Sequence, residues 1–195
     1  MSRTSLIVLI ALGATFAGFV LASNAQRLSD GEPEAAPSVA AGPQVATLGW
    51  RETYGSGGER LVFTVDALEV TATGWSARVG IENASSVGWE LAPSATPDGT
   101  FGLQLFPTGD PEELEARNRE GTLPAVRAAE RYDPELPKIL EPKDEWKGRI
   151  SARGSLVAGA SVRVVFGTLV AVGKPPSELS ETLVWITDSA YELEP

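Results

Sequence analysis

The sequence predicts an all-β fold, an antiparallel β-sandwich of about seven strands with one short surface helix. Several runs alternate apolar and polar residues, which is typical of strands with one buried face. Turn signals separate these runs about every ten residues, and 20 Gly and 14 Pro among 195 residues disfavour long helices. Together these observations favour a sandwich, with an eight-strand barrel as the alternative.

Residues 1–25 have the features of a signal peptide or an N-terminal membrane anchor. One cation, Arg3, precedes 17 uncharged residues, LIVLIALGATFAGFVLA (6–22). Small residues offer a signal peptidase a cleavage site near Ala25, whereas 17 apolar residues also approach the length that spans a bilayer. Both alternatives stay open, and both place the rest of the chain outside the cytoplasm.

Residues 26–44 are expected to form a linker, because Ala, Pro, Ser and Glu dominate them and no aromatic residue occurs there. A tether between an apolar segment and a domain favours the anchor over cleavage. The β-sandwich domain then spans residues 45–195. Acidic residues dominate its charge, within a net charge of −10 for the whole chain, so we expect an acidic extracytoplasmic domain.

The clearest strand pair is predicted over residues 61–82. Residues 61–70 are rich in β-branched side chains, and a turn follows at 72–74. In GWSARVGIE (74–82) the apolar side chains fall on one face of a strand and the polar side chains on the other. We therefore expect a hairpin whose second strand directs four side chains into the core, those of Trp75, Ala77, Val79 and Ile81.

Residues 87–91 and 101–105 continue the alternation, with a turn at 97–99 between them. A short polar helix is predicted over 110–121, because Asp110 can cap it, Pro111 suits its first position and Gly121 follows its end. Only Leu114 and Ala116 could be buried, so we expect this helix on the surface. A calcium loop is the alternative for its acidic residues, but they lack the ligand spacing of such loops.

Residues 122–145 contain four prolines and are expected to form an irregular connection between sheets. Strands follow at 146–152, 161–172 and 182–187. The run at 161–172, SVRVVFGTLVAV, is the most apolar of the domain, so we expect it at the centre of a sheet. Tryptophans within the predicted strands would fill the space between the sheets, at Trp75, Trp89, Trp146 and Trp185.

The order of these features resembles a known family. Residues 81–85 end a strand on Asn-x-Ser, and a Phe-x-Leu strand follows a glycine turn at 99–103. A Leu-x-Pro loop at 140–142 then leads to a Leu-x-x-Gly-x-x-Val-x-Val-x-Phe strand at 156–166. Over about residues 60–187 this pattern is similar to the telokin-like, immunoglobulin-like domains of exported bacterial proteins of unknown function. The resemblance implies an immunoglobulin-like sandwich and export, and it brings no catalytic residues.

The composition restricts the chemistry. The chain has no Cys and no His, so disulfides, cysteine nucleophiles and histidine-based catalytic groups are excluded. Zinc, copper, haem and iron–sulfur centres favour ligands that this sequence lacks, so we expect no metal site and no cofactor. The net charge of −10 disfavours nucleic acid and anionic membrane surfaces as partners.

Paired carboxylates are the remaining route to catalysis, as in glycoside hydrolases. Nothing in the sequence places two acids in one cleft, and solvated surface acids are the simpler interpretation. We therefore predict no catalytic residues. The acids considered for this role are Asp66, Glu69, Asp98, Asp133, Asp144 and Asp188.

Asn83 begins an Asn-x-Ser sequence and is the one candidate modification site, as a glycan acceptor. Asn is also common where a strand turns, since its side chain bonds its own backbone, and this is the simpler interpretation. On that interpretation Asn83→Gln should have little effect, whereas Val79→Asp should unfold the domain by burying a charge.

The sequence thus predicts a non-enzymatic, extracytoplasmic interaction or structural module whose partner is a protein or a cell-envelope component. Attachment to the membrane through residues 6–22 follows if that segment is not cleaved. The Pro-rich stretch 122–145 is the expected contact surface, and a basic partner would complement the acidic domain. The alternative function is a carboxylate-dependent hydrolase acting on cell-envelope polysaccharide.

Overall fold

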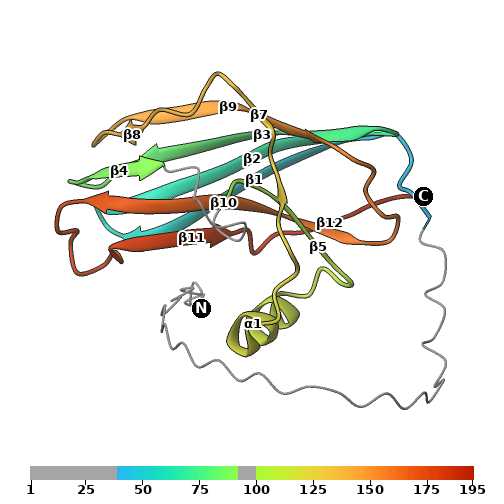
Figure 1. Cartoon of the computed structure of the whole chain (residues 1–195). Coiled ribbons are helices and arrows are strands. Elements are labelled where there is room, and N and C mark those ends of the chain that lie inside the picture. The colour runs from blue at the N-terminus through green and yellow to red at the C-terminus, as the bar shows by residue number, and fades with distance from the viewer. Residues whose placement is uncertain (1–38, 92–99) are drawn as a thin grey trace, which may run out of the picture.

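The computed structural model describes residues 39–91 and 100–195, which form two antiparallel sheets packed as a sandwich (Figure 1). The predicted all-β sandwich is confirmed. The apolar segment 6–22, the cleavage site near Ala25 and the turn at 97–99 lie outside the described residues. Within the described ranges, no helix has the length and apolar character needed to cross a membrane.

The first sheet contains five strands in the order β1–β2–β3–β9–β7. The predicted hairpin is confirmed, because β2 and β3 pair from Leu61↔Asn83 to Thr71↔Gly74. β9 pairs with β3, and β7 is the edge strand beside β9. The bounds of these strands are β1 (Gln44–Ser56), β2 (Glu59–Thr71), β3 (Gly74–Asn83), β7 (Arg131–Asp133) and β9 (Glu145–Arg153).

The second sheet is built around β10 (Ser161–Val172), so the central place predicted for this run is confirmed. One edge of β10 pairs with β5 and β4, and the other edge pairs with β12 and β11. β6 pairs with β5, and β8 pairs with β4. These strands are β4 (Gly88–Leu91), β5 (Gly102–Phe106), β6 (Arg127–Ala128), β8 (Ile139–Leu140), β11 (Thr182–Ile186) and β12 (Tyr191–Glu192).

Aromatic rings fill the core between the two sheets. Trp185 stacks on Phe63 with ring centroids 5.1 Å apart, and Phe63 also contacts Phe166 at 4.9 Å. Burying each large apolar side chain contributes about 1.5–3 kcal/mol, which stabilises a chain that has no disulfide. The side chains predicted to be buried are buried, namely Trp75, Ala77, Val79, Ile81, Trp89, Trp146 and Trp185.

Helix α1 (Pro111–Glu120) packs on the outer face of the second sheet (Figure 1). Its ends form as predicted, since Asp110 Oδ1 accepts a hydrogen bond from the Glu112 N–H at 2.9 Å and Gly121 is left-handed at φ 68°. Leu114 is buried in an apolar cluster, so the helix covers the sheet as well as facing solvent. The partners of Leu114 in this cluster are Phe106, Val165, Val184 and Ile186.

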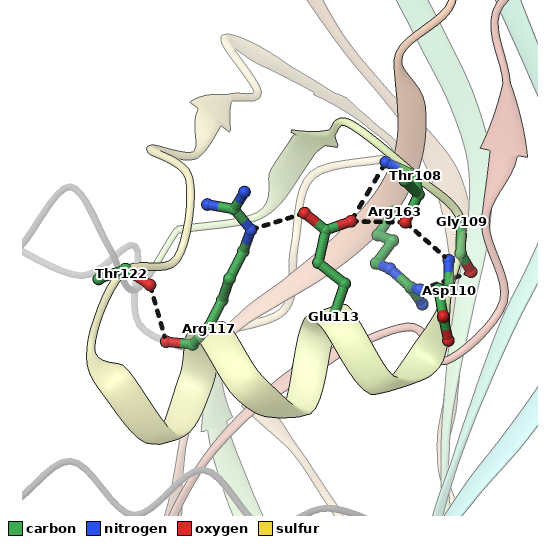
Figure 2. A network of polar contacts seen from close by, with 7 residues as sticks. All are labelled: Thr108, Gly109, Asp110, Glu113, Arg117, Thr122 and Arg163. Atoms are coloured by element: carbon green, nitrogen blue, oxygen red, sulfur yellow. Dashed lines mark hydrogen bonds and ion pairs between the residues drawn. The ribbon is translucent and has the colours of Figure 1, made fainter.

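Polar contacts fix the start of α1 (Figure 2). The Glu113 carboxylate accepts hydrogen bonds from the Thr108 N–H at 3.2 Å and hydroxyl at 2.6 Å, and it pairs with Arg117 at 2.8 Å. These contacts hold the pKa of Glu113 below its ordinary value, with the Thr108 hydroxyl as the largest cause. Arg163 on β10 is fully buried and donates from Nη2 to the Gly109 carbonyl at 2.9 Å. The residues that lead into α1 are therefore hydrogen-bonded to the central strand β10.

The strands predicted from the sequence begin at residue 61, and β1 is an additional strand that runs along β2 over 13 residues. A register shift between Thr47 and Trp50, with Gly49 at φ 62°, breaks the alternation that would reveal this strand. Residues 122–145 are not wholly irregular, because they contain the short strands β6, β7 and β8.

The packed domain begins before the end of the predicted linker 26–44. Ala41 is buried, and its N–H donates to the Leu156 carbonyl at 2.8 Å. The N–H of Gly42 donates to the carbonyl of Glu194 at 3.3 Å. The segment that enters the domain and the segment 193–195 therefore lie side by side at one pole of the sandwich.

Candidate functional site

A groove of about 790 Å³ opens on one flank of the sandwich, where the edge strand β7 of the first sheet approaches β4 of the second. Residues 135–138, which lead to β8, complete its wall. Its apolar surface comes from Leu91, Tyr132 and Leu136, and its charged side chains are Glu90, Glu130, Arg131, Asp133, Glu135 and Lys138.

Hydrogen bonds to the rest of the fold hold the walls of this groove. The Leu91 N–H donates to the Lys138 carbonyl at 3.1 Å, which joins residues 135–138 to β4. The Trp146 indole Nε1 donates to the Glu135 carbonyl at 3.2 Å, which joins the same segment to β9. A concave site with walls fixed in this way is pre-formed, so a ligand meets little ordering cost on binding.

Tyr132 provides a rigid aromatic surface in the groove. Its ring lies edge-on to Phe101, with centroids 5.9 Å apart and an interplanar angle of 83°. Burial raises the pKa of the Tyr132 phenol, although a side-chain hydrogen bond with Thr100 acts in the opposite direction. The hydroxyl therefore stays protonated at neutral pH and can donate or accept a hydrogen bond.

Carboxylates outnumber cations in the groove by four to two. Glu130, Asp133 and Glu135 are exposed and Glu90 is half-buried, so each can meet a ligand in solvent. β7 is the last strand of its sheet and pairs only with β9 among the described strands. An edge strand of this kind leaves backbone donors and acceptors unpaired beside the acidic side chains.

Of the acids considered from the sequence, only Asp133 lies in this groove. Asp66 and Glu69 are exposed on β2, and Asp144 is exposed just before β9. Asp188 follows β11, where its carbonyl accepts a hydrogen bond from buried Arg163. Asp98 lies outside the described residues.

Asn83 is the last residue of β3, and its side chain is fully buried. Its Nδ2 donates to the carbonyls of Val87 at 2.8 Å and of Leu140 and Glu141 at 3.0 Å each. Its Oδ1 accepts from the backbone N–H and the hydroxyl of Ser85, at 3.0 and 2.6 Å. In the folded domain this amide cannot meet a glycosyltransferase, so transfer of a glycan to it would have to precede folding.

The Asn83 network also overturns the expectation that Asn83→Gln has little effect. Ser85 Oγ accepts a further hydrogen bond from the indole of buried Trp89 at 3.1 Å, so the amide is linked to the core. A longer side chain has no space in a fully buried position where every polar atom is already bonded. Asn83 therefore has a structural role, since its hydrogen bonds join the end of β3 to the segment at 140–141.

Of the acids at α1, Asp110 caps the helix, and Glu113 bonds Thr108 and pairs with Arg117. In the described part of the chain no group of three or more acidic side chains is placed to hold a metal ion.

Comparison with protein-family models, with curated proteins and with solved structures finds no match.

The stretch in which the sequence predicts a contact surface overlaps the lining of this groove, and that prediction stays untested. The stretch 122–145 contributes most of the groove. Glu90 and Leu91 could not be assigned to it, since they lie about 40 residues earlier and meet it only through pairing of β4 with β8. The signal that could have indicated the site is the acidic spacing of Glu130, Asp133 and Glu135 around one tyrosine.

Proposed function

We propose that this chain is a non-enzymatic, extracytoplasmic interaction module that binds a basic, extended segment of a protein partner in the groove beside β7. The observation that carries the proposal is the excess of carboxylates around a fixed aromatic surface, beside an edge of β7 that pairs with no other described strand. Lysine or arginine side chains would pair with the acids, and the backbone of the segment would pair with β7.

An immunoglobulin-like topology, related to the telokin-like domains, is part of this proposal. The strand orders β2–β3–β9–β7 and β4/β5–β10–β11 correspond to the ABED and CFG sheets of constant-type immunoglobulin domains, with β1 as an additional strand. Trp89 on β4 occupies the strand that carries the buried tryptophan of that fold. These two features support the assignment.

The groove can be tested with a fluorescent peptide of alternating lysine and valine and the full-length protein in mild detergent. Binding should be followed by fluorescence anisotropy at low and physiological salt, because rim charges act mainly through salt-dependent attraction. We expect the double variant Glu130→Lys, Glu135→Lys to weaken binding at least tenfold. A peptide of alternating glutamate and valine should not bind.

The matched control places the same charge reversals elsewhere. Glu112 and Glu120 are exposed on α1, away from the groove, so Glu112→Lys, Glu120→Lys changes the net charge equally. If both double variants weaken binding alike, the attraction is a property of overall charge and the groove proposal is wrong. Capture of partners from the cell envelope, with the groove variant as the comparison, would then identify the natural ligand.

Export belongs to the same proposal, and its basis is the apolar segment 6–22 followed by the linker. A reporter that is active only outside the cytoplasm, fused to residues 1–45, tests it. An inactive fusion would contradict the proposed extracytoplasmic location. Carbonate extraction of the full-length protein then distinguishes an anchor, which stays with the membrane, from a cleaved signal.

One observation keeps a hydrolase as the second candidate. Glu90, Glu130, Asp133 and Glu135 gather in one groove, and carboxylate pairs at suitable separation hydrolyse glycosidic bonds. Release of reducing ends from cell-envelope polysaccharide, abolished by Glu90→Gln or Asp133→Asn with the fold intact, would favour this function. Unchanged release after single amide substitution of each of the four acids would reject it.

A further inference from the structure

The outer face of the first sheet carries two arginines directly opposite each other. Arg78 on β3 and Arg149 on β9 are partners in the register of the antiparallel pair, and both are exposed. Side chains in such a position have their Cβ atoms about 4.5–5.5 Å apart, and like charges there destabilise the sheet. Helix α1 covers the other sheet, so no described helix shields this face (Figure 1).

Two neighbouring cations on this face form ion pairs with carboxylates, whereas Arg78 and Arg149 do not within the described residues. Arg51 pairs with Glu82 at 3.0 Å, and Lys147 pairs with Glu145 at 2.6 Å. Neither guanidinium of Arg78 and Arg149 forms a hydrogen bond or an ion pair with any residue in the ranges 39–91 and 100–195. The two guanidinium groups are therefore adjacent and free of direct ion pairs with described residues, while Asp133 lies opposite Arg149 in the register of β7 and β9 and Asp66 and Glu69 lie nearby.

A hollow lies on each side of this arginine pair. One, of about 370 Å³, is lined by both arginines with Asp66, Asp133 and Lys147. The other, of about 210 Å³, is lined by both arginines with Glu69 and Ser76.

We propose that Arg78 and Arg149 bind the anionic group of an acidic polysaccharide, whose sugar hydroxyls occupy the two hollows. Planar guanidinium groups recognise carboxylate or phosphate through paired hydrogen bonds. Asp66, Glu69 and Asp133 are acceptors for hydroxyl groups, and the Ser76 hydroxyl can donate or accept. An anion flanked by hydroxyls therefore complements the arrangement of cations at the centre and acceptors on both sides.

Other polyanions fit this face less well. Neither hollow has an aromatic ring, so bases of a single-stranded nucleic acid have no stacking surface. The acids beside the arginines would repel a dense polyanion that has no hydroxyls to offer them. On this proposal the negative charge of a ligand is not sufficient for binding, and the hydroxyl groups of the ligand must contribute as well.

Binding of polygalacturonate to the full-length protein tests the inference. The measurement is the dissociation constant, with the polymer-induced rise in thermal midpoint as a second readout. We expect Arg78→Ala and Arg149→Ala each to weaken binding at least tenfold and to lose the rise in midpoint. Both variants should fold, because each relieves a repulsion on the surface. A phosphate-substituted dextran used in parallel shows whether carboxylate or phosphate is preferred.

Arg153→Ala is the matched control, since Arg153 is also exposed on β9, four residues after Arg149 and on the same face. Polyacrylate, which has carboxylates but no hydroxyls, and unsubstituted dextran, which has hydroxyls but no charge, should both bind poorly. Equal loss in Arg153→Ala, or equal affinity for polyacrylate, would overturn the inference, as would no binding at all. The groove beside β7 is tested with other residues and another ligand, so either proposal can fail alone.

Discussion

The Glu52 carboxylate on β1 accepts a hydrogen bond from the indole Nε1 of Trp185 on β11 at 3.0 Å, and so joins the edge strands of the two sheets. The same carboxylate accepts from the backbone N–H groups of Asp188 at 3.0 Å and Ser189 at 2.9 Å. Glu52 therefore helps to close this flank of the sandwich, where the Tyr54 hydroxyl on β1 also bonds Ser180, whereas the opposite flank forms the groove beside β7.

Glu52→Gln should lower the free energy of unfolding by about 1–3 kcal/mol, because a charged acceptor of three hydrogen bonds becomes a neutral side chain with one acceptor oxygen. Urea unfolding followed by tryptophan fluorescence measures the change. Glu69→Gln is the control, since Glu69 is exposed on β2 and should change stability by less than about 0.5 kcal/mol. Equal effects of the two substitutions would mean that the hydrogen bonds of Glu52 do not contribute to stability.

Asn83→Gln should destabilise the domain by at least about 2 kcal/mol, since it disturbs a fully buried network that satisfies three carbonyls. Chemical denaturation provides the measurement. Asn118→Gln makes the same chemical change on α1, where Asn118 is only half-buried, and should be nearly neutral. Intact-mass analysis of the protein purified from its own cells should also find Asn83 without a glycan, and a glycan there would contradict its burial in the fold.

Val79→Asp should abolish cooperative folding, because Val79 is 2% exposed in the core and an isolated carboxylate cannot be solvated there. Thermal unfolding monitored by circular dichroism tests this expectation. Thr53→Asp places the same acid on an exposed position of β1 and should retain the transition. A transition of Val79→Asp at the parental temperature would be incompatible with the core described above.

The contacts of Glu113 make the docking of α1 dependent on pH. Its pKa is lower in the folded protein than in the unfolded chain, mainly through the Thr108 hydroxyl and then through Arg117. The resulting stabilisation is complete above the ordinary glutamate pKa of about 4.3 and is lost as the pH falls through the lowered value. The stability difference between the parent and Glu113→Gln should therefore shrink as the pH falls from 6 to about 3.

Unfolding free energies over that pH range measure the effect. Glu115→Gln is the matched control, because Glu115 is exposed on the same helix and no partner is seen for its carboxylate in the described residues. A constant difference between parent and Glu113→Gln at every pH would show that the carboxylate contributes through shape rather than charge.

Local signals in the sequence identified much of the fold. The β2–β3 hairpin and α1 were predictable because alternation and capping depend on residues close in the chain. β1 was not, since a bulge at Gly49 interrupts its alternation and its stability comes from pairing with β2. Arg163 and Asn83 are polar residues in the interior, and their burial depends on carbonyls supplied by distant segments.

The candidate site was predictable only in outline. Composition indicated an acidic domain, and the prolines of 122–145 indicated an exposed contact surface. The groove itself depends on β8 pairing with β4 and on Trp146 holding Glu135, which are contacts between segments that the sequence does not relate. The arginine pair likewise appears only once the register of β3 and β9 is known.

The hydrogen bond between the Gly42 N–H and the Glu194 carbonyl places the two ends of the packed domain next to each other. A short peptide could therefore connect residue 195 to residue 40, and the chain could be opened instead at the tight turn of residues 57–58 between β1 and β2. Such a circular permutant would keep every strand pair while moving the chain termini to the opposite pole. The geometry thus allows the domain to be presented to a surface in either of two opposite orientations.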